Sequence, residues 1–124
     1  MIEEYYQSLL HLVAQARLVR AQEITLDTRS EHTTLIRGDL YFTDNSRLHF
    51  RELVKMEGSV QRLMYVYHYQ RADATLIFRY DNTDHPTQFP DNPHHKHDGS
   101  QANMIAVEPS NLVPVLEEIE RLIA

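Results

Sequence analysis

Apolar residues recur at intervals of three and four positions over the first part of the chain. They are Ile2, Tyr5, Tyr6, Leu9, Leu10, Val13 and Ala16. This spacing is that of one face of an α-helix. Glu3 and Glu4 stand in what would be the first turn and Arg17 and Arg20 in the last, where their charges favour the helix dipole. The pattern predicts an amphipathic N-terminal helix that extends to about Arg20.

From Ala21 onward the period changes from three or four residues to two, which is typical of strands with one buried face. The expected strands lie around Ile24–Leu26 and at His32–Thr43, Arg47–Lys55, Val60–Gln70 and Thr75–Asp81. Their polar connections are short, and short connections require antiparallel neighbours. The sequence therefore predicts a strongly twisted, five-stranded antiparallel meander.

After Asp81 the periodicity stops, and prolines and a glycine interrupt the chain to about Asn103. A loop of this length is uncommon in a small domain unless it is functional or disordered. Met104–Val107 is either a short strand or a packed tether, and a final helix is expected to run from a cap at Ser110 or Asn111 to Ile123. The expected fold class is α+β in one domain of 124 residues: an N-terminal helix, the meander sheet, a long His/Pro loop and a C-terminal helix.

Alternation along strands assigns side chains to the two faces of the sheet. A three-residue loop at Asp44–Ser46 would pair Leu40 with Phe50, Phe42 with Leu48, and Asp39 with Arg51. This register places one polar set on a single face: Arg37, Asp39, Tyr41, Arg47, His49 and Arg51.

The next hairpin separates an aromatic face from a mixed one. Tyr65, Tyr67 and Tyr69 share a face with Leu76, Phe78 and Tyr80, which would form the floor for the helices. The opposite face carries Met64, Val66, His68, Ile77, Arg79 and Asp81. Because two helices can cover only one side of the sheet well, we expect this second set to join the side that carries Arg37. The result would be a concave face of arginine, histidine and aspartate, roofed by the histidine loop.

The distribution of charge changes which partners are compatible with the chain. The net charge is −6, yet residues 32–79 carry seven basic and five acidic side chains, for +2, whereas residues 80–124 carry two basic and eight acidic ones. The basic middle keeps a polyanion open as a partner. Cysteine is absent, which excludes disulfides and thiolate chemistry. Neither a secretory leader nor a membrane-spanning run is visible, so we expect a soluble, cytoplasmic protein without a membrane partner.

The stretch PHHKH, Pro93–His97, allows three interpretations. It is a solvated surface turn, a metal site or part of a catalytic site. In an extended segment His95 and His97 could reach one ion, with His85 or His68 as a third imidazole and Asp81 or Asp98 nearby. The spacing H-H-x-H is a weak signal without a companion motif, and we expect no metal or other cofactor.

Metal-independent cleavage of RNA is the chemistry that the histidines and arginines suit best. Attack by the 2′-hydroxyl requires a base, an acid for the leaving 5′-oxygen, and cations that hold the phosphorane. Imidazoles transfer protons near neutral pH, and arginine binds phosphate through two parallel hydrogen bonds. The candidate catalytic residues are His68, Arg79, Asp81, His95 and His97. The candidate phosphate contacts are Arg37, Arg47, His49, Arg51, His85, His94 and Lys96.

Each of these candidates also has an ordinary structural interpretation. His68 stands in an aromatic run and could be a hydrogen-bonded core histidine. Asp39 with Arg51, and Arg79 with Asp81, could be simple ion pairs between neighbours.

Four ordered motifs together resemble the TumE family of toxins from bacterial toxin–antitoxin pairs. They are RGDLYFTDNSRLHFRE (Arg37–Glu52), YVYHYQ (Tyr65–Gln70), FRYDN (Phe78–Asn82) and PHHKH (Pro93–His97). The resemblance implies a growth-inhibiting protein neutralised by direct binding of a helix-turn-helix antitoxin, and RNA cleavage by analogy with other small toxins. One departure is Thr83–Pro86, which keeps one histidine where relatives tend to have two.

The sequence leaves alternatives open. The first is a binding protein without chemistry, which docks a nucleic acid or a protein and inhibits by occupancy. The second is a metalloenzyme with histidine ligands. A homodimer is also compatible with the sequence, which does not identify the RNA target.

Overall fold

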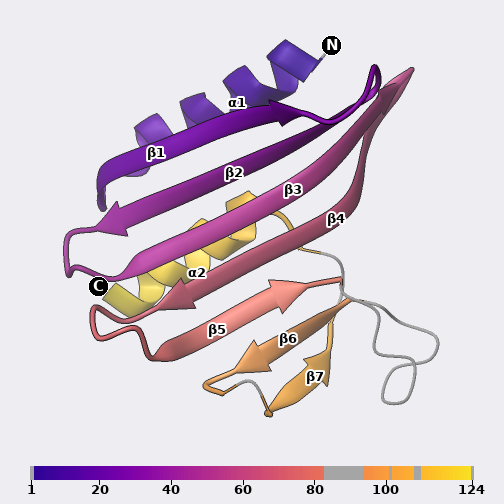
Figure 1. Cartoon of the computed structure of the whole chain (residues 1–124). Coiled ribbons are helices and arrows are strands. Elements are labelled where there is room, and N and C mark those ends of the chain that lie inside the picture. The colour runs from indigo at the N-terminus through magenta and orange to yellow at the C-terminus, as the bar shows by residue number, and fades with distance from the viewer. Residues whose placement is uncertain (1, 83–93, 101, 108–109, 124) are drawn as a thin grey trace.

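The computed structural model describes residues 2–82, 94–100, 102–107 and 110–123. The chain runs through α1 (Ile2–Gln15), β1 (Val19–Thr28), β2 (Thr33–Phe42), β3 (Arg47–Glu57), β4 (Ser59–Gln70), β5 (Leu76–Asp81), β6 (His95–Asp98), β7 (Met104–Ala106) and α2 (Leu112–Ile123). The strands form one antiparallel sheet in the order β1-β2-β3-β4-β5-β6-β7 (Figure 1). The predicted α+β class and the meander are confirmed, but the sheet has seven strands in the described part of the chain, not five.

One additional strand, β6, comes from the segment that was expected to be a loop, and the other, β7, confirms the short strand that was one of two alternatives at Met104–Val107. His95–Asp98 pairs with β5, and Met104–Ala106 pairs in turn with β6. Each strand is only three or four residues long, and the prolines and glycine around them hide their alternation. PHHKH is therefore not a loop over the sheet, because its residues from His95 onward are part of the sheet. Residues 83–93, which include His85, lie outside the described residues.

The first helix ends earlier than predicted, whereas the last begins where it was expected. α1 ends at Gln15, so Arg17 and Arg20 lie beyond it, and Arg20 instead donates from Nε to the backbone oxygen of Phe42 at 3.2 Å. From Val19 onward the chain pairs with β2 as strand β1, and this pairing outweighs the helical spacing of the apolar residues. At α2 the side chain of Asn111 accepts the N–H of Val113 at 3.0 Å, which confirms the predicted cap. None of the helices in the described ranges is long and apolar enough to cross a membrane.

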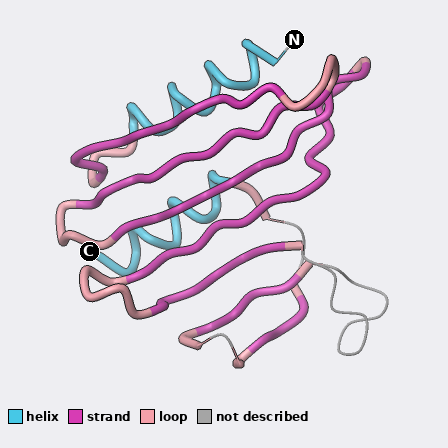
Figure 2. The backbone as a smooth tube through the Cα atoms, viewed as in Figure 1, coloured by secondary structure: helices cyan, strands magenta, loops and turns pink. Residues whose placement is uncertain are grey.

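Both helices pack on the same side of the sheet, as Figures 1 and 2 show. The core lies between them and the sheet, and its largest fully buried side chains include Phe50, Tyr65, Tyr67, Tyr69 and Phe78. The predicted aromatic face is therefore the floor under the helices. Gly38 of β2 makes room for this packing, because a Cβ there would lie 2.3 Å from the ring of Phe50. The other face of the sheet carries no helix among the described residues.

The hairpin between β2 and β3 differs from the predicted register by two residues. Leu40 pairs with Leu48 and Asp39 with His49, so the predicted partners Phe50 and Arg51 are wrong. The turn closes earlier because the Phe42 N–H bonds to the Ser46 oxygen at 2.9 Å and Asn45 adopts a φ of 69°. A shift of two residues preserves alternation. The predicted division of the polar and apolar side chains of β2 and β3 between the two faces is therefore correct. In β5, Ile77 was expected on the polar face but packs against the core, next to a register shift between Tyr69 and Gln70 of β4.

Candidate functional site

Two rows of residues, all polar except Val66, cross the helix-free face of the sheet. In the first, backbone partners on successive strands from β2 to β6 are Asp39, His49, His68, Arg79 and His97. In the second, displaced by two residues along each strand, they are Arg37, Arg51, Val66, Asp81 and His95. Paired residues on adjacent strands point to the same side of a sheet. Strand register therefore gathers side chains from five sequence segments on one face.

Asp39 organises one end of the first row. Its Oδ1 accepts hydrogen bonds from Arg47 Nε at 2.9 Å and Nη2 at 2.6 Å, and it lies 3.0 Å from His49 Nδ1. Partial burial alone would raise the pKa of Asp39, but the hydrogen bonds from Arg47 and His49 bring it below its ordinary value. Asp39 is therefore an ionised anchor that orients an arginine and a histidine.

Asp81 organises the other end, where β5 and β6 meet. Its carboxylate lies 2.8 Å from Arg79 Nε, 2.6 Å from His95 Nε2 and 3.7 Å from His97 Nε2. The Asp81 and His95 side chains are almost completely buried, and that of His97 is 8% exposed. Arg79 is 27% exposed, so it presents its cation at the surface while Asp81 holds it from below.

His68 lies between these two ends, next to Arg79 in the register. Its pKa lies below the ordinary value, mainly because the ring is partly buried and also because the Arg79 guanidinium repels an imidazolium. The nearby His49 and Arg47 act in the same direction. At neutral pH His68 is therefore an uncharged imidazole, which can accept a proton.

A shallow depression lies over the middle of this face. It is lined by Arg47, His49, Arg51, Val66, His68, Gln70 and Arg79. Arg51 Nε is buried and has no hydrogen-bond acceptor among the described residues. A buried donor without an acceptor is costly, and an oxygen of a bound anion would satisfy it. The depression thus combines three arginines with a neutral histidine, which suits a phosphate diester.

Three of the predicted residues also form a geometric candidate for a metal site. One ligand atom each of Asp81, His95 and His97 lies within 4.8 Å of the other two. The sequence predicted that His95 and His97 could share an ion with Asp81 nearby, and the two strands bring these side chains together. His68 does not belong to this group, although the sequence had offered it as a third imidazole.

The structure does not bring His94 and Lys96 to this face. Lys96 Nζ lies 2.9 Å from Glu118 of α2 and 5.1 Å from the ring centre of Tyr80, on the helix side. His94 Nδ1 lies 2.7 Å from the Tyr65 hydroxyl. Alternation along β6 explains the placement, because Lys96 points opposite to its two histidine neighbours.

Arg37 lies at the margin of the site. Its guanidinium is half exposed and 3.8 Å from Asp27 of β1, away from the depression.

Glu52 is a polar residue that the sequence analysis did not single out. It is fully buried on the helix side, where its carboxylate accepts hydrogen bonds from the hydroxyls of Tyr5 and, at 2.5 Å, Tyr67. Arg62 donates to the same Tyr67 hydroxyl at 2.8 Å. The signal was present in the sequence, since alternation along β3 places this acid on the core face between Phe50 and Val54.

Comparison with models of protein families gave a match to this chain. A family model described as "Toxin TumE" matches residues 9–124, which is nearly the whole chain. The search of curated proteins and the search of solved structures found no match.

Proposed function

The chain belongs to the TumE toxin family, and on that premise we propose that it is an endoribonuclease that cleaves RNA without a metal ion. Membership makes it the toxin of a toxin–antitoxin pair, with an antitoxin as its partner. Under the proposal it acts on cytoplasmic RNA, and growth stops until the antitoxin binds. The helix-free face carries the site.

The observation that carries this proposal is the order of three residues in one row. His68, Arg79 and His97 are backbone partners on the adjacent strands β4, β5 and β6. Neighbouring strands lie about 4.8 Å apart, so the two histidine backbones are about 10 Å apart with the arginine between them. A phosphate bound to Arg79 would have an imidazole on each side. This is the arrangement that in-line displacement at phosphorus requires, since base and acid act on opposite sides.

His68 is the proposed general base. As a neutral imidazole it removes the proton of the 2′-hydroxyl, and the 2′-oxygen attacks phosphorus. Its lowered pKa makes it a weaker base than an ordinary histidine, but keeps it unprotonated at neutral pH.

His97 is the proposed general acid, and Asp81 and His95 are positioning residues. Protonated His97 gives its proton to the 5′-oxygen as the bond from phosphorus to that oxygen breaks. The products are a 2′,3′-cyclic phosphate and a free 5′-hydroxyl. Exchange with solvent then removes the proton from His68 and returns one to His97. Asp81, held by His95 at 2.6 Å, is placed to orient His97 and Arg79 together.

The arginines supply the positive charge that the reaction needs. Arg79 is placed to stabilise the charged phosphorane, and Arg51 offers a buried Nε without an acceptor among the described residues. Arg47 and His49, fixed by Asp39, would bind a neighbouring phosphate. Arginines at these positions would contact the phosphates of the RNA backbone and not the bases, so the proposal does not specify a base sequence.

The experiment is incubation of the purified chain with labelled RNA in the presence of EDTA. We expect discrete fragments that end in 2′,3′-cyclic phosphate. His68→Ala and His97→Ala should each slow cleavage by about 10²–10⁴-fold, the usual contribution of one proton-transfer group. His32→Ala, which changes an exposed histidine before β2, is the matched control and should cleave like the wild type. Intact RNA that is retained by the protein would instead support inhibition by occupancy.

A second candidate function is metal-dependent cleavage, favoured by the group of Asp81, His95 and His97. Two imidazoles and a carboxylate are a common ligand set for a catalytic zinc ion. This reading predicts one divalent ion per chain after purification, loss of the ion in His95→Ala, and loss of cleavage in EDTA. Cleavage that persists in EDTA while the ion content is zero would exclude it.

A further inference from the structure

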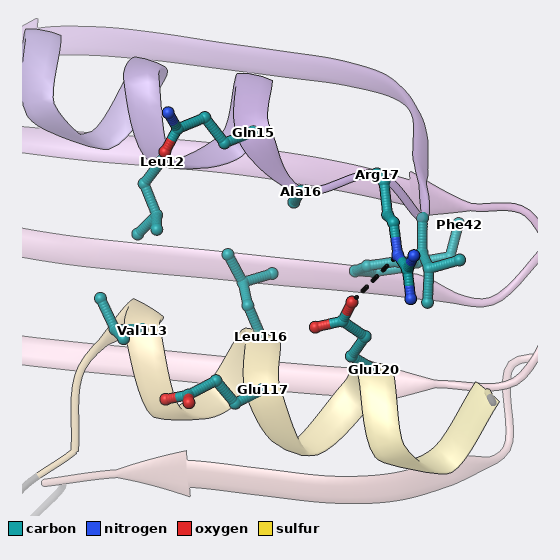
Figure 3. A pocket seen from close by; sticks show the side chains of 10 residues that line it. Leu12, Gln15, Ala16, Arg17, Phe42, Val113, Leu116, Glu117 and Glu120 are labelled. Carbon is teal, nitrogen blue, oxygen red and sulfur yellow. Dashed lines mark ion pairs between the residues drawn. The ribbon is translucent and has the colours of Figure 1, made fainter.

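The helix side of the molecule contains an apolar groove between α1 and α2. Figure 3 shows Leu12 of α1 pointing toward Val113 and Leu116 of α2 across this groove. The ion pair between Arg17 and Glu120, at 3.4 Å, lies at one end. Val113 is 47% exposed although it is apolar, so the groove offers apolar area to a partner.

The groove continues into a second pocket that leads to a buried charge. Leu12, Gln15 and Val113 line both pockets, so the two pockets adjoin along the helices. The second pocket extends between Tyr5 and Asn111 to Glu52.

Glu52 has hydrogen-bond donors but no ion pair among the described residues. Its two oxygens accept from Tyr5 and Tyr67. Arg62, which also lines the second pocket, contacts the Tyr67 hydroxyl at 2.8 Å and lies 4.7 Å from the ring centre of Tyr65. Burial and then the negative charge of Glu52 raise the pKa of both tyrosine hydroxyls. A buried carboxylate is stabilised strongly by a cation brought next to it. The pocket is therefore suited to an arginine or lysine side chain.

The charges of the two sides of the molecule differ in sign. α1 and α2 together carry five glutamates and one arginine, for −4, and Glu117 has no ion pair in the described part of the chain. The opposite face presents Arg47, Arg51 and Arg79. The acidic helices would repel RNA and attract a basic partner.

We propose that the groove between α1 and α2 docks a basic, amphipathic segment of the antitoxin. Its apolar side chains would lie between Leu12 and Val113, and a basic side chain would enter the second pocket toward Glu52. The proposal rests on membership of the toxin family but not on the ribonuclease assignment. It places the antitoxin on the side of the sheet opposite to the catalytic residues.

The test is the affinity of the purified chain for the protein encoded by the adjoining gene, measured by calorimetry at two salt concentrations. Glu117→Lys combined with Glu120→Lys should weaken binding at least tenfold, and more at low salt. Val113→Lys should weaken it similarly. Glu52→Gln keeps the shape and removes the charge, and should weaken binding about tenfold. Glu3→Lys combined with Glu4→Lys, on exposed positions outside both pockets, is the matched charge control and should bind within twofold of wild type at the higher salt concentration, where charges away from the contact are screened.

Thermal unfolding and circular dichroism establish that each variant is folded before its affinity is compared. Affinity unchanged in the folded groove variants would overturn the proposal, as would a loss confined to Arg51→Met or Arg79→Gln on the other face. Because binding is measured without RNA, failure of the groove proposal and failure of the ribonuclease proposal give different results.

Discussion

The position of His68 on the sheet determines the direction in which its pKa shifts. Partial burial and the neighbouring cations, Arg79 first among them, both favour the neutral ring. A histidine in a more exposed position would be partly protonated at pH 6.5 and less able to act as a base. The proposed mechanism therefore depends on the row that brings His68 and Arg79 together.

Titration of the histidine ring by NMR measures this effect directly. We expect the pKa of His68 to lie below 6.5, the value expected for an unperturbed ring, and to rise toward it in Arg79→Gln. Because the pKa of His68 is lowered in the native state, the native protein takes up this proton at a lower pH than the unfolded chain does. The contribution of His68 to stability is therefore fully present above about pH 6.5 and is lost as the pH falls toward the native pKa. A wild-type pKa at or above 6.5, or no change in Arg79→Gln, would contradict the account.

Alternation along a strand decides the roles of single residues more reliably than their chemistry does. Lys96 is a good phosphate ligand in principle, but it lies between His95 and His97 and thus points to the helices. Glu52 was overlooked because a single glutamate in a strand suggests no chemistry. Its position was informative, since alternation along β3 places it on the core face. Glu52 could have been assigned from the sequence by applying alternation to every charged residue of β3, whereas Lys96 could not, because β6 was not predicted as a strand.

The short strand β6 contributes to both sides of the molecule. His95 and His97 meet Asp81 on one face, and Lys96 ties the strand to Glu118 of α2 on the other. The aromatic rings of Phe78 and Tyr80 lie 5.4 and 5.1 Å from the lysine nitrogen. Lys96 therefore acts as a structural contact that holds β6 in register.

Replacing Lys96 by methionine separates this structural role from phosphate binding. We expect Lys96→Met to lower the free energy of unfolding by about 1–2 kcal/mol, because Glu118 loses a charged hydrogen-bond partner. RNA cleavage by the folded variant should stay within about twofold of wild type. Arg51→Met is the matched change on the other face and should reduce cleavage by about 10–100-fold. Equal losses of cleavage in both variants, measured under conditions where both are folded, would argue against the assignment.

The elements differ in how well the sequence predicted them. The long strands β2 to β5 have enough alternating positions to reveal both their extent and their faces. The partner of each residue was harder to predict, since the turn at Asn45 moved the β2–β3 register by two. β6 was missed because it forms by pairing with β5 and leaves little local pattern, whereas a strand at Met104–Val107 was one of the two alternatives that the sequence offered.

The whole molecule has two faces with separate chemistry. Three arginines and two histidines line a depression on one side of a single sheet. The two helices lie on the other side (Figure 1), with an apolar groove between them (Figure 3). The sequence predicted the first face from alternation and from the basic residues of its middle third. It did not reveal the groove, which depends on how two helices distant in sequence lie next to each other.

The most direct test of the catalytic account uses RNA whose 5′-bridging oxygen is replaced by sulfur at one position. Sulfur leaves without protonation, so a general acid is no longer needed. We expect His97→Ala to cleave this substrate at nearly the wild-type rate, although it fails on ordinary RNA, and His68→Ala to remain slow on both. If His97→Ala stays equally slow on the sulfur substrate, His97 is not the general acid and the proposed mechanism is wrong.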